Sequence, residues 1–365
     1  MRIALVSDCY PPRLGGMEAQ VHGLATQLQT AGHRVEVFTI TPGSGDPIDG
    51  VAVHRLGLPR ELPGGWLVNP AAARPLRAAL RTGGFDVVHA HLGVVSPFAM
   101  DGVRVAHGLG LPVAVTWHSV TARAEPVVRA LGYPRRWARR GAALSAVSPV
   151  AAAPIRRTAG ARVALLPNGI DASFWSPAGG IGAGRPGALR VVSAMRLAAR
   201  KRPLELVSAV ARAREASGVD IQLTIAGDGP LRGRLERLAG ATGGAWCALP
   251  GRLTPVELRE LYRSAQVYVA PARLEAFGIA AAEALASGLP VIAPRASGVA
   301  GFVEDNRTGL LVDDDAGLRG ALVQVAGDHR LLTGLSSYAR EAGPGLDWSN
   351  VVGAVIAEYE RAIAG

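Results

Sequence analysis

Strand-like apolar runs alternate with helix-like amphipathic stretches through the first half of the chain. The runs lie at residues 3–7, 35–40, 86–91, 113–116, 144–147 and 163–166. They are short and mostly apolar, which is typical of strands in a parallel sheet that is covered on both faces. A helical pattern over residues 18–31, which ends at Gly32, joins the first two runs. The pattern predicts a doubly wound α/β domain, in which ligands bind beyond the carboxyl ends of the strands.

The second half repeats this plan without repeating the sequence. Strands are predicted at residues 189–195, 221–226, 267–270 and 291–293, and helices at 204–216, 277–287 and 348–364. Between the halves, residues 179–187 (GGIGAGRPG) have the composition of a flexible connector. We therefore expect an N-terminal domain over residues 1–172, a linker over 173–188 and a C-terminal domain over 189–347.

Length and composition agree with two globular domains. The chain has 365 residues, of which 49% are hydrophobic, enough to bury two cores. Apolar runs are shorter than 18 residues, so no membrane-spanning helix is expected, and the first residues are better explained as a strand than as a signal peptide. The two cysteines, Cys9 and Cys247, are far apart and lie in no metal-binding pattern. They predict a cytoplasmic protein without disulfides or structural zinc.

The net charge of +10 is concentrated in the first half. Residues 1–170 contain 18 arginines and 9 acidic residues, whereas residues 171–365 contain 21 basic and 20 acidic residues. A basic domain can meet nucleic acid, anionic lipid or an acidic substrate. Nucleic acid is not favoured, because only 5% of the residues are aromatic and no nucleic-acid module is present.

Residues 270–294 (APARLEAFGIAAAEALASGLPVIAP) carry the clearest candidate chemistry. Glu275 precedes the predicted helix 277–287 and Glu283 lies within it, with seven residues between them. Small residues fill the gap, so the free N–H groups of the first helical turn can face an anion. Two carboxylates beside an anion site suit a sugar nucleotide, which has a diphosphate in the middle and hydroxyls at both ends. The alternative is an alanine-rich buried helix with two solvated acids.

This E-x7-E stretch resembles that of the retaining glycosyltransferases of family 4, which have the two-domain GT-B fold. The resemblance implies that the backbone of Phe277, Gly278 and Ile279 meets the donor diphosphate. It also implies that Glu275 accepts hydrogen bonds from the sugar and that Glu283 accepts them from the ribose. In such enzymes two Rossmann-like domains face a cleft, and the final helix (348–365 here) packs back on the first domain.

A second motif, RLAARKRP, follows the predicted strand 189–195. Arg196 and Lys201 stand five residues apart, where a guanidinium fork and a point charge can straddle a diphosphate. The family carries Arg and Lys here, and both are interpreted as holding the donor pyrophosphate. Lys201 is the chain's single lysine, although Arg200 and Arg202 flank it and leave the register uncertain by one residue.

Two motifs of the first domain resemble the family as well. Gly15 and Gly16 precede the first helix, where two glycines allow a backbone to approach a phosphate closely; the alternative is an ordinary turn. His118 follows the strand 113–116 and resembles the position at which the family's histidine touches the transferred sugar. His89 and His91 are expected to be structural, which is also the alternative for His118.

Other segments add less. Residues 249–253 (LPGRL), with Arg252 and Leu253, match the segment whose backbone lies near the nucleobase in the family. The acidic run 313–315 follows a strand and precedes a helix, so we expect helix capping there rather than a metal site. The family's Gly-Gly-x-x-Glu is replaced by Ala300–Gly301 before Glu304, so no ligand contact is assigned to that loop.

A basic stretch within residues 123–140 (RALGYPRRWARR) has charges all round any helix drawn through it. A solvated basic face explains it without further assumption. The hypothesis beside this is a lipid-surface patch, with Trp137 and Tyr133 at headgroup depth. It would use the four arginines Arg135, Arg136, Arg139 and Arg140.

Together these motifs predict a retaining, metal-independent hexosyltransferase. It would move a hexosyl group from a nucleoside-diphosphate sugar, of the GDP-mannose or UDP-sugar type, to a hydroxyl acceptor, and would need no cofactor. Catalytic roles fall to His118, Glu275, Arg196 and Lys201. The alternatives are a nucleotide-sugar 2-epimerase or hydrolase on the same fold, and a non-enzymatic binding protein. The sequence leaves open the donor, the linkage, the oligomeric state, attachment to the inner face of the cell membrane, and whether the acceptor is a lipid, a glycan or a soluble metabolite.

Overall fold

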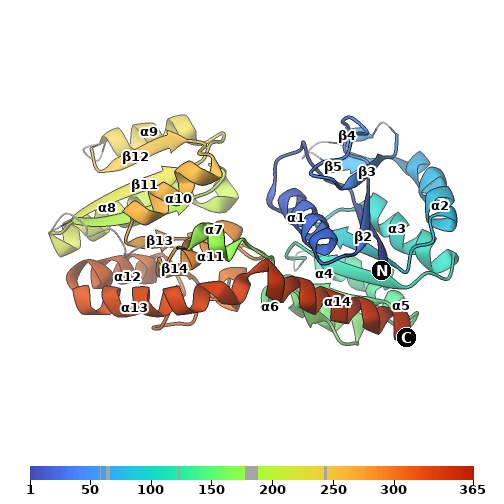
Figure 1. Cartoon of the computed structure of the whole chain (residues 1–365). Helices are drawn as coiled ribbons and strands as arrows, with labels where there is room; N and C mark the ends of the chain where they lie inside the picture. Colours follow the sequence, from blue (N-terminus) through green and yellow to red (C-terminus); the bar gives the residue numbers. More distant parts are fainter. Residues whose placement is uncertain (58, 63–65, 122–123, 177–187, 242–244) are drawn as a thin grey trace. The chain divides into compact units, whose positions relative to one another are not determined.

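The computed structural model describes residues 1–57, 59–62, 66–121, 124–176, 188–241 and 245–365. The chain divides into two compact units (Figure 1). Unit 1 comprises Met1–Gly169 and Trp348–Gly365, and unit 2 comprises Ile170–Asp347. The proposed connector, residues 179–187, lies outside the described residues.

Unit 1 is built on a parallel sheet with the strand order β3-β2-β1-β6-β7-β8-β9. All its neighbouring strands run parallel, as expected for short apolar strands joined by helices. The antiparallel pair β4–β5 is separate from this sheet. The strands are β1 (Arg2–Ser7), β2 (Arg34–Thr39), β3 (Ala52–Arg55), β4 (Arg60–Leu62), β5 (Trp66–Val68), β6 (Val87–Leu92), β7 (Val113–Trp117), β8 (Ala143–Ala146) and β9 (Ala164–Leu165).

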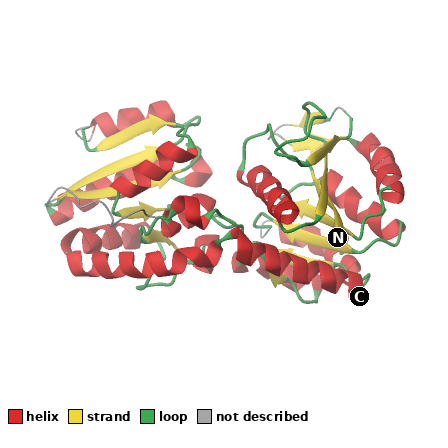
Figure 2. Cartoon of the chain, viewed as in Figure 1, coloured by secondary structure: helices red, strands yellow, loops and turns green. Residues whose placement is uncertain are grey.

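The helices of unit 1 flank this sheet, and the last of them comes from the far end of the chain (Figure 2). α14 buries Val355 and Tyr359 in the same core as Ile3 and Leu5 of β1. Its first residue, Trp348, lies so close to Gly23 that a Cβ there would be 2.6 Å from the indole ring. The helices are α1 (Gly16–Thr30), η1 (Pro70–Ala72), α2 (Ala73–Thr82), α3 (Pro97–Gly108), α4 (Glu125–Leu131), α5 (Tyr133–Ala138), α6 (Pro149–Ala159) and α14 (Trp348–Ala364).

Unit 2 is a second doubly wound sheet, with the strand order β12-β11-β10-β13-β14-β15. Its strands also pair in parallel. The order places the carboxyl ends of β10 and β13 side by side. The strands are β10 (Ala188–Ala194), β11 (Asp220–Ala226), β12 (Cys247–Gly251), β13 (Val267–Val269), β14 (Val291–Pro294) and β15 (Gly309–Val312).

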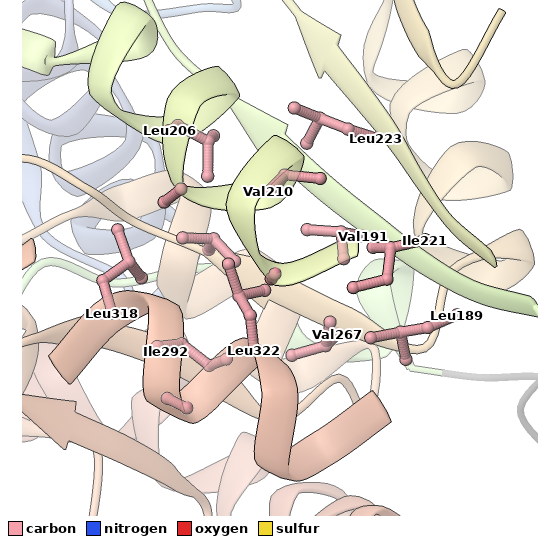
Figure 3. Close-up of a cluster of buried hydrophobic side chains, with 14 of the residues drawn as sticks. Leu189, Val191, Leu206, Val210, Ile221, Leu223, Val267, Ile292, Leu318 and Leu322 are labelled. Carbon is pink, nitrogen blue, oxygen red and sulfur yellow. The ribbon is translucent and has the colours of Figure 1, made fainter. Parts of the chain in front are cut away.

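The core of unit 2 forms where α8 and α12 cover the sheet (Figure 3). Leu206 of α8 and Leu322 of α12 are fully buried there, together with Ile221 of β11. The helices are α7 (Ala172–Trp175), η3 (Ala199–Lys201), α8 (Pro203–Ser217), α9 (Arg232–Ala241), α10 (Pro255–Ser264), α11 (Ile279–Ala286), η4 (Gly298–Gly301), α12 (Asp315–Gly327), α13 (His329–Ala342) and η5 (Gly343–Leu346). Over the described part of the chain, no helix is both long and apolar enough to span a bilayer.

Candidate active site

The N-terminus of α11 is an open helix end reached through a sharp turn. Gly278 precedes the helix with a φ of 95°, in the left-handed region that favours glycine. A Cβ at this position would also lie 2.7 Å from Cγ2 of Val299. The ring of Phe277 is buried against Phe302, with 5.0 Å between ring centroids, and anchors the turn. The helix therefore begins two residues later than predicted, at Ile279, and its first N–H groups have no acceptor within the helix.

Lys201 and Glu275 form an ion pair beside this helix end. Both side chains are mostly buried, with 20% and 18% of their surfaces exposed. The neighbouring Arg202 turns elsewhere: its guanidinium donates to both oxygens of Asp315, at 2.9 and 2.7 Å. The sequence left open which of the adjacent cations at positions 200–202 lies beside Glu275. In the structure this cation is Lys201.

Arg196 follows β10, and its side chain is exposed. Its guanidinium has no hydrogen bond or ion pair to any residue that the structure describes. The loop that carries it packs on the turn after β11, residues 227–230 (GDGP): Gly227 lies against the carbonyl of Met195 and Gly229 against that of Leu197. A side chain on either glycine would displace this loop, so the turn serves to position the Arg196–Lys201 segment.

Glu283 is a half-buried residue of α11. Burial raises its pKa to about 8, so the group is mostly protonated at neutral pH in the free protein. Tyr262 and Tyr268 lie near enough that the charge of Glu283 adds to burial in raising their pKa values. The charge of Glu275 also contributes to raising the pKa of Tyr268. The hydroxyl of Tyr268 donates a hydrogen bond to the carbonyl of Ala194 at 3.1 Å.

Tyr268 is the residue here that sequence reasoning missed. The sequence pattern places Tyr268 only in a buried strand. In the structure, the charges of both carboxylates of the E-x7-E motif contribute to raising the pKa of its hydroxyl group. The sequence does contain a signal for this role, since Tyr268 stands between two valines in β13. A buried tyrosine hydroxyl needs a hydrogen-bond partner, so its position in a buried strand indicates polar groups nearby.

Two further segments lie next to the proposed donor clamp, by which we mean Arg196, Lys201 and Glu275 with the N-terminus of α11. Arg252 is exposed and Leu253 half-buried just after β12, and Gly251 before them accepts a hydrogen bond from the N–H of Gly227 at 2.6 Å. In the loop after β14, the N–H of Gly298 donates to the carbonyl of Glu275 at 2.8 Å. It is thus Gly298, rather than Ala300–Gly301, that packs on the Glu275 loop.

The acidic run before α12 is occupied by structural contacts. Asp314 caps the helix by accepting from the N–H of Gly317 at 2.8 Å. Asp313 and Asp315 pair with arginines. Within the described residues, no cluster of histidine, cysteine and acidic side chains could hold a metal ion.

The glycine loop of unit 1 meets a carboxylate of its own helix. The side chain of Glu18 folds back against Gly15 so closely that a Cβ there would collide with the carboxylate. Glu18 is 10% exposed and pairs with Arg13 at 3.3 Å. Gly16 is the first residue of α1. A negative charge of the chain itself therefore lies at this helix end, where the sequence suggested a phosphate.

His118 belongs to a buried network of histidines. Its Nε2 is 3.0 Å from Nδ1 of His91, and His89 bonds to Tyr359 and Thr116 at 2.8 and 2.7 Å. Burial lowers the pKa of His118 to about 4 and that of His89 to about 3. His89 and His91 thus have the structural surroundings expected of them.

The same network limits what His118 can do in this conformation. Its second ring nitrogen, Nδ1, is buried as well. The three histidines, Asn168 and Trp348 line a cavity of about 20 Å³, which is close to the size of one water molecule. His118 would have to rotate its ring away from His91 before it could bond to a sugar.

The two aromatic residues of the basic stretch differ in burial: Trp137 is buried and Tyr133 is half-buried. Trp137 is 6% exposed and packs against Trp117 and Tyr133, with ring centroids 6.1 and 4.7 Å apart. The suggestion that Trp137 reaches headgroup depth is therefore wrong, because this side chain is buried, whereas Tyr133 is half-buried and its part of the suggestion stays untested. The exposed apolar side chains are Val127 and Leu131 of α4, at 61% and 57%. Exposed arginines occur in the same stretch of chain, at positions 129, 135, 136, 139 and 140.

Comparison with known proteins identifies the family. Residues 14–174 match the family described as Glycosyltransferase Family 4, and residues 185–341 match Glycosyl transferases group 1. A D-inositol 3-phosphate glycosyltransferase of Arthrobacter sp. (strain FB24) is 31% identical over 82% of this chain and 78% of its own length. This chain belongs to glycosyltransferase family 4.

Other relatives cover nearly the whole chain. A GDP-mannose-dependent alpha-mannosyltransferase of Mycolicibacterium smegmatis is 30% identical, covering 100% of this chain and 98% of the relative. A phosphatidyl-myo-inositol mannosyltransferase of the same species is 28% identical over 99% and 94%. These relatives are named for glycosyl transfer, so the comparisons favour a transferase over the epimerase or hydrolase alternative.

Solved structures confirm the predicted GT-B fold. Sucrose-phosphate synthase from Thermosynechococcus elongatus matches with a TM-score of 0.77 and 23% identity, over 100% of this chain and 99% of that one. Anabaena HepE, solved in complex with UDP and glucose, matches with a TM-score of 0.74 and 16% identity, over 99% of both chains.

Proposed function

We propose that this glycosyltransferase transfers a hexosyl group, with retention of configuration, from a nucleoside-diphosphate sugar of the GDP-mannose or UDP-sugar type to a hydroxyl acceptor. The observation that carries the proposal is the Lys201–Glu275 pair at the open end of α11, with unpaired Arg196 on the adjoining loop. Relatives named for GDP-mannose and for inositol acceptors support the substrate class.

The donor diphosphate would lie against the N-terminus of α11, between Arg196 and Lys201. As the glycosidic bond breaks, negative charge develops on the departing phosphate. The two cations and the aligned N–H groups are already in place for that charge, so they stabilise the transition state without costly reorganisation. These groups supply the positive charge that a metal ion would otherwise provide, so we propose that transfer needs no metal.

Glu275 would have two successive roles. In the free protein it neutralises Lys201 and holds the ammonium group at the helix end. When the diphosphate takes over Lys201, the carboxylate becomes free to accept hydrogen bonds from the sugar. A carboxylate engaged in this way is not a covalent nucleophile, which suits front-face attack assisted by the leaving phosphate.

Glu283 would bind the ribose hydroxyls. A protonated carboxyl group accepts fewer hydrogen bonds than a carboxylate, and the pKa of about 8 keeps the proton on Glu283 at neutral pH. Binding of two hydroxyl donors favours the ionised form, so donor binding would release this proton.

The experiment combines a binding screen with product analysis. Thermal shifts would be measured with GDP, UDP, ADP and dTDP and with their hexose conjugates. The best conjugate would then be incubated with glycan and inositol acceptors, with and without EDTA, and the anomeric configuration of the product determined by NMR. We expect one nucleotide to stabilise the protein, and a retained product whose yield EDTA leaves unchanged. A donor that hydrolyses or epimerises without transfer would refute the proposal.

We further propose that unit 1 attaches to an anionic membrane surface on the cytoplasmic side. Val127 and Leu131 would enter the headgroup region while the exposed arginines of the same stretch meet lipid phosphates. The test is co-sedimentation with vesicles of 30% phosphatidylglycerol. Replacing Arg135, Arg136, Arg139 and Arg140 by Gln should release the protein, and unchanged binding would contradict the proposal.

A further inference from the structure

A groove of about 680 Å³ lies on unit 2, lined mainly by residues of α8, α9 and α12. Each helix presents one face to it: residues 204, 208 and 212 are spaced by single turns of α8, and residues 234 and 238 by one turn of α9. Small residues, Ser208 and Ala209, leave the hollow open along α8. The volume lies in the range of small-molecule sites, and none of the proposed donor-binding residues lines the groove.

Three arginines line the groove without an ion pair to any residue that the structure describes. Arg212, Arg234 and Arg319 line it, one from each helix, and all three are exposed. None has an ion pair or a hydrogen bond from its side chain to the parts of the chain that are described.

The two acids in the lining do not neutralise these arginines, since both face another cation. Glu205 and Asp315 pair with Arg202, at 3.6 and 2.7 Å, and Asp315 pairs with Arg273 as well. Three guanidinium groups around one hollow therefore remain free to bind an anion, and guanidinium forks match phosphate oxygens geometrically.

The wall of the groove is apolar. Leu204, Leu231 and Leu238 are half-buried along it. A fully hydrated ion would gain nothing from such a wall, whereas a phosphorylated organic molecule would place its carbon skeleton there and its phosphates on the arginines.

We propose that this groove binds a small organic molecule carrying two or more phosphate groups, at a site separate from the donor site. A nucleoside diphosphate and a sugar bisphosphate share that chemistry. Ala199 of η3, the same turn that carries Lys201, is one of the residues lining the groove. An occupant therefore contacts the segment that places the proposed donor clamp.

Calorimetric titration of the full-length protein with ADP and with fructose 1,6-bisphosphate tests this, since the two probes distinguish the nucleotide from the sugar-phosphate source. All titrations use the Lys201→Ala variant as the parent protein, because this substitution weakens binding of the probe at the proposed donor clamp. The test variant replaces Arg212, Arg234 and Arg319 by Gln. The matched control replaces Arg237 of α9 and Arg330 of α13 by Gln, because both are exposed arginines of unit 2 that do not line the groove.

We expect at least one probe to bind with a Kd below about 1 mM at low salt, and the triple variant to weaken it by roughly tenfold or more, since three charge-assisted contacts are lost. The control variant should bind within about twofold of its parent. The proposal is overturned if neither probe binds, if the triple variant binds as tightly as its parent, or if the control variant weakens binding equally. Unchanged circular dichroism and melting temperature of the triple variant show that a loss is not unfolding.

Discussion

The two units each present a helix N-terminus after a glycine, and the two ends differ in what meets them. At α1 the carboxylate of Glu18 folds back on Gly15, and Arg13 is its partner. At α11 the preceding carboxylate, Glu275, is drawn to Lys201 instead. The first helix end holds an anion that the chain supplies, whereas the second has no side-chain cap and its preceding carboxylate is paired with a lysine.

The two helix ends therefore lead to different expectations for a bound phosphate, although a glycine precedes both helices. The helix dipole attracts an anion in both cases, and the sequence of the first turn determines which one. α1 has an acid at its third residue, while the first turn of α11 has only small and aliphatic side chains. Donor binding should therefore depend on the α11 end far more than on the α1 end.

The largest expected effect is at the cation of the α11 end. Lys201→Ala should reduce kcat by about 100-fold or more, because a charged contact to the developing pyrophosphate is lost. The matched change at the other helix, Arg13→Ala, should alter kcat by less than about threefold. Turnover at saturating acceptor measures both, and equal losses in the two variants would remove the distinction between the ends.

The next effect is on the pH dependence of donor binding. The pKa of Glu283 is raised to about 8, so the free protein carries a proton there that the proposed complex lacks. Affinity should rise by up to about tenfold per pH unit below pH 8 and level off above it. Nucleotide titrations between pH 6 and 9 measure this, and a slope that persists in Glu283→Gln would assign it to another group.

The glycines that precede α1 and α11 also differ in backbone conformation. Gly278→Ala should lower the free energy of unfolding by roughly 1–2 kcal/mol or more, because φ is 95° and the new Cβ meets Val299. Gly15→Ala should cost less than about 0.5 kcal/mol, since its φ of −179° suits any residue and only the end of the Glu18 side chain must move. Denaturant unfolding compares the two, and a larger loss for Gly15→Ala would contradict the description.

The smallest effect is expected at Glu18 itself. Glu18→Gln should destabilise the protein by about 0.5–1 kcal/mol, because the anion at the N-terminus of α1 is lost. Donor affinity should stay the same or increase slightly, as the charge that would repel a phosphate is removed. Isothermal titration with the preferred nucleotide measures this, and a strong loss of affinity would make Glu18 a ligand-binding residue.

Local pattern was enough to determine the architecture. Short apolar runs and helical periodicity indicated two doubly wound sheets, and the structural comparisons confirm that fold. The E-x7-E spacing and the Arg-Lys motif also led to the correct family. These features are readable because they depend on residues close together in sequence, where strand and helix periods fix which side chains share a face.

The tertiary structure decided which side chains remain available for a ligand. Lys201 is next to Glu275 because Arg202 is held by Asp315, 113 residues away. Long-range partners likewise turn His118 towards His91 and bury Trp137 against Trp117. The sequence names the candidate charges, but an ion pair or buried contact forms only with a neighbour that folding brings near, and that neighbour determines the direction of the side chain.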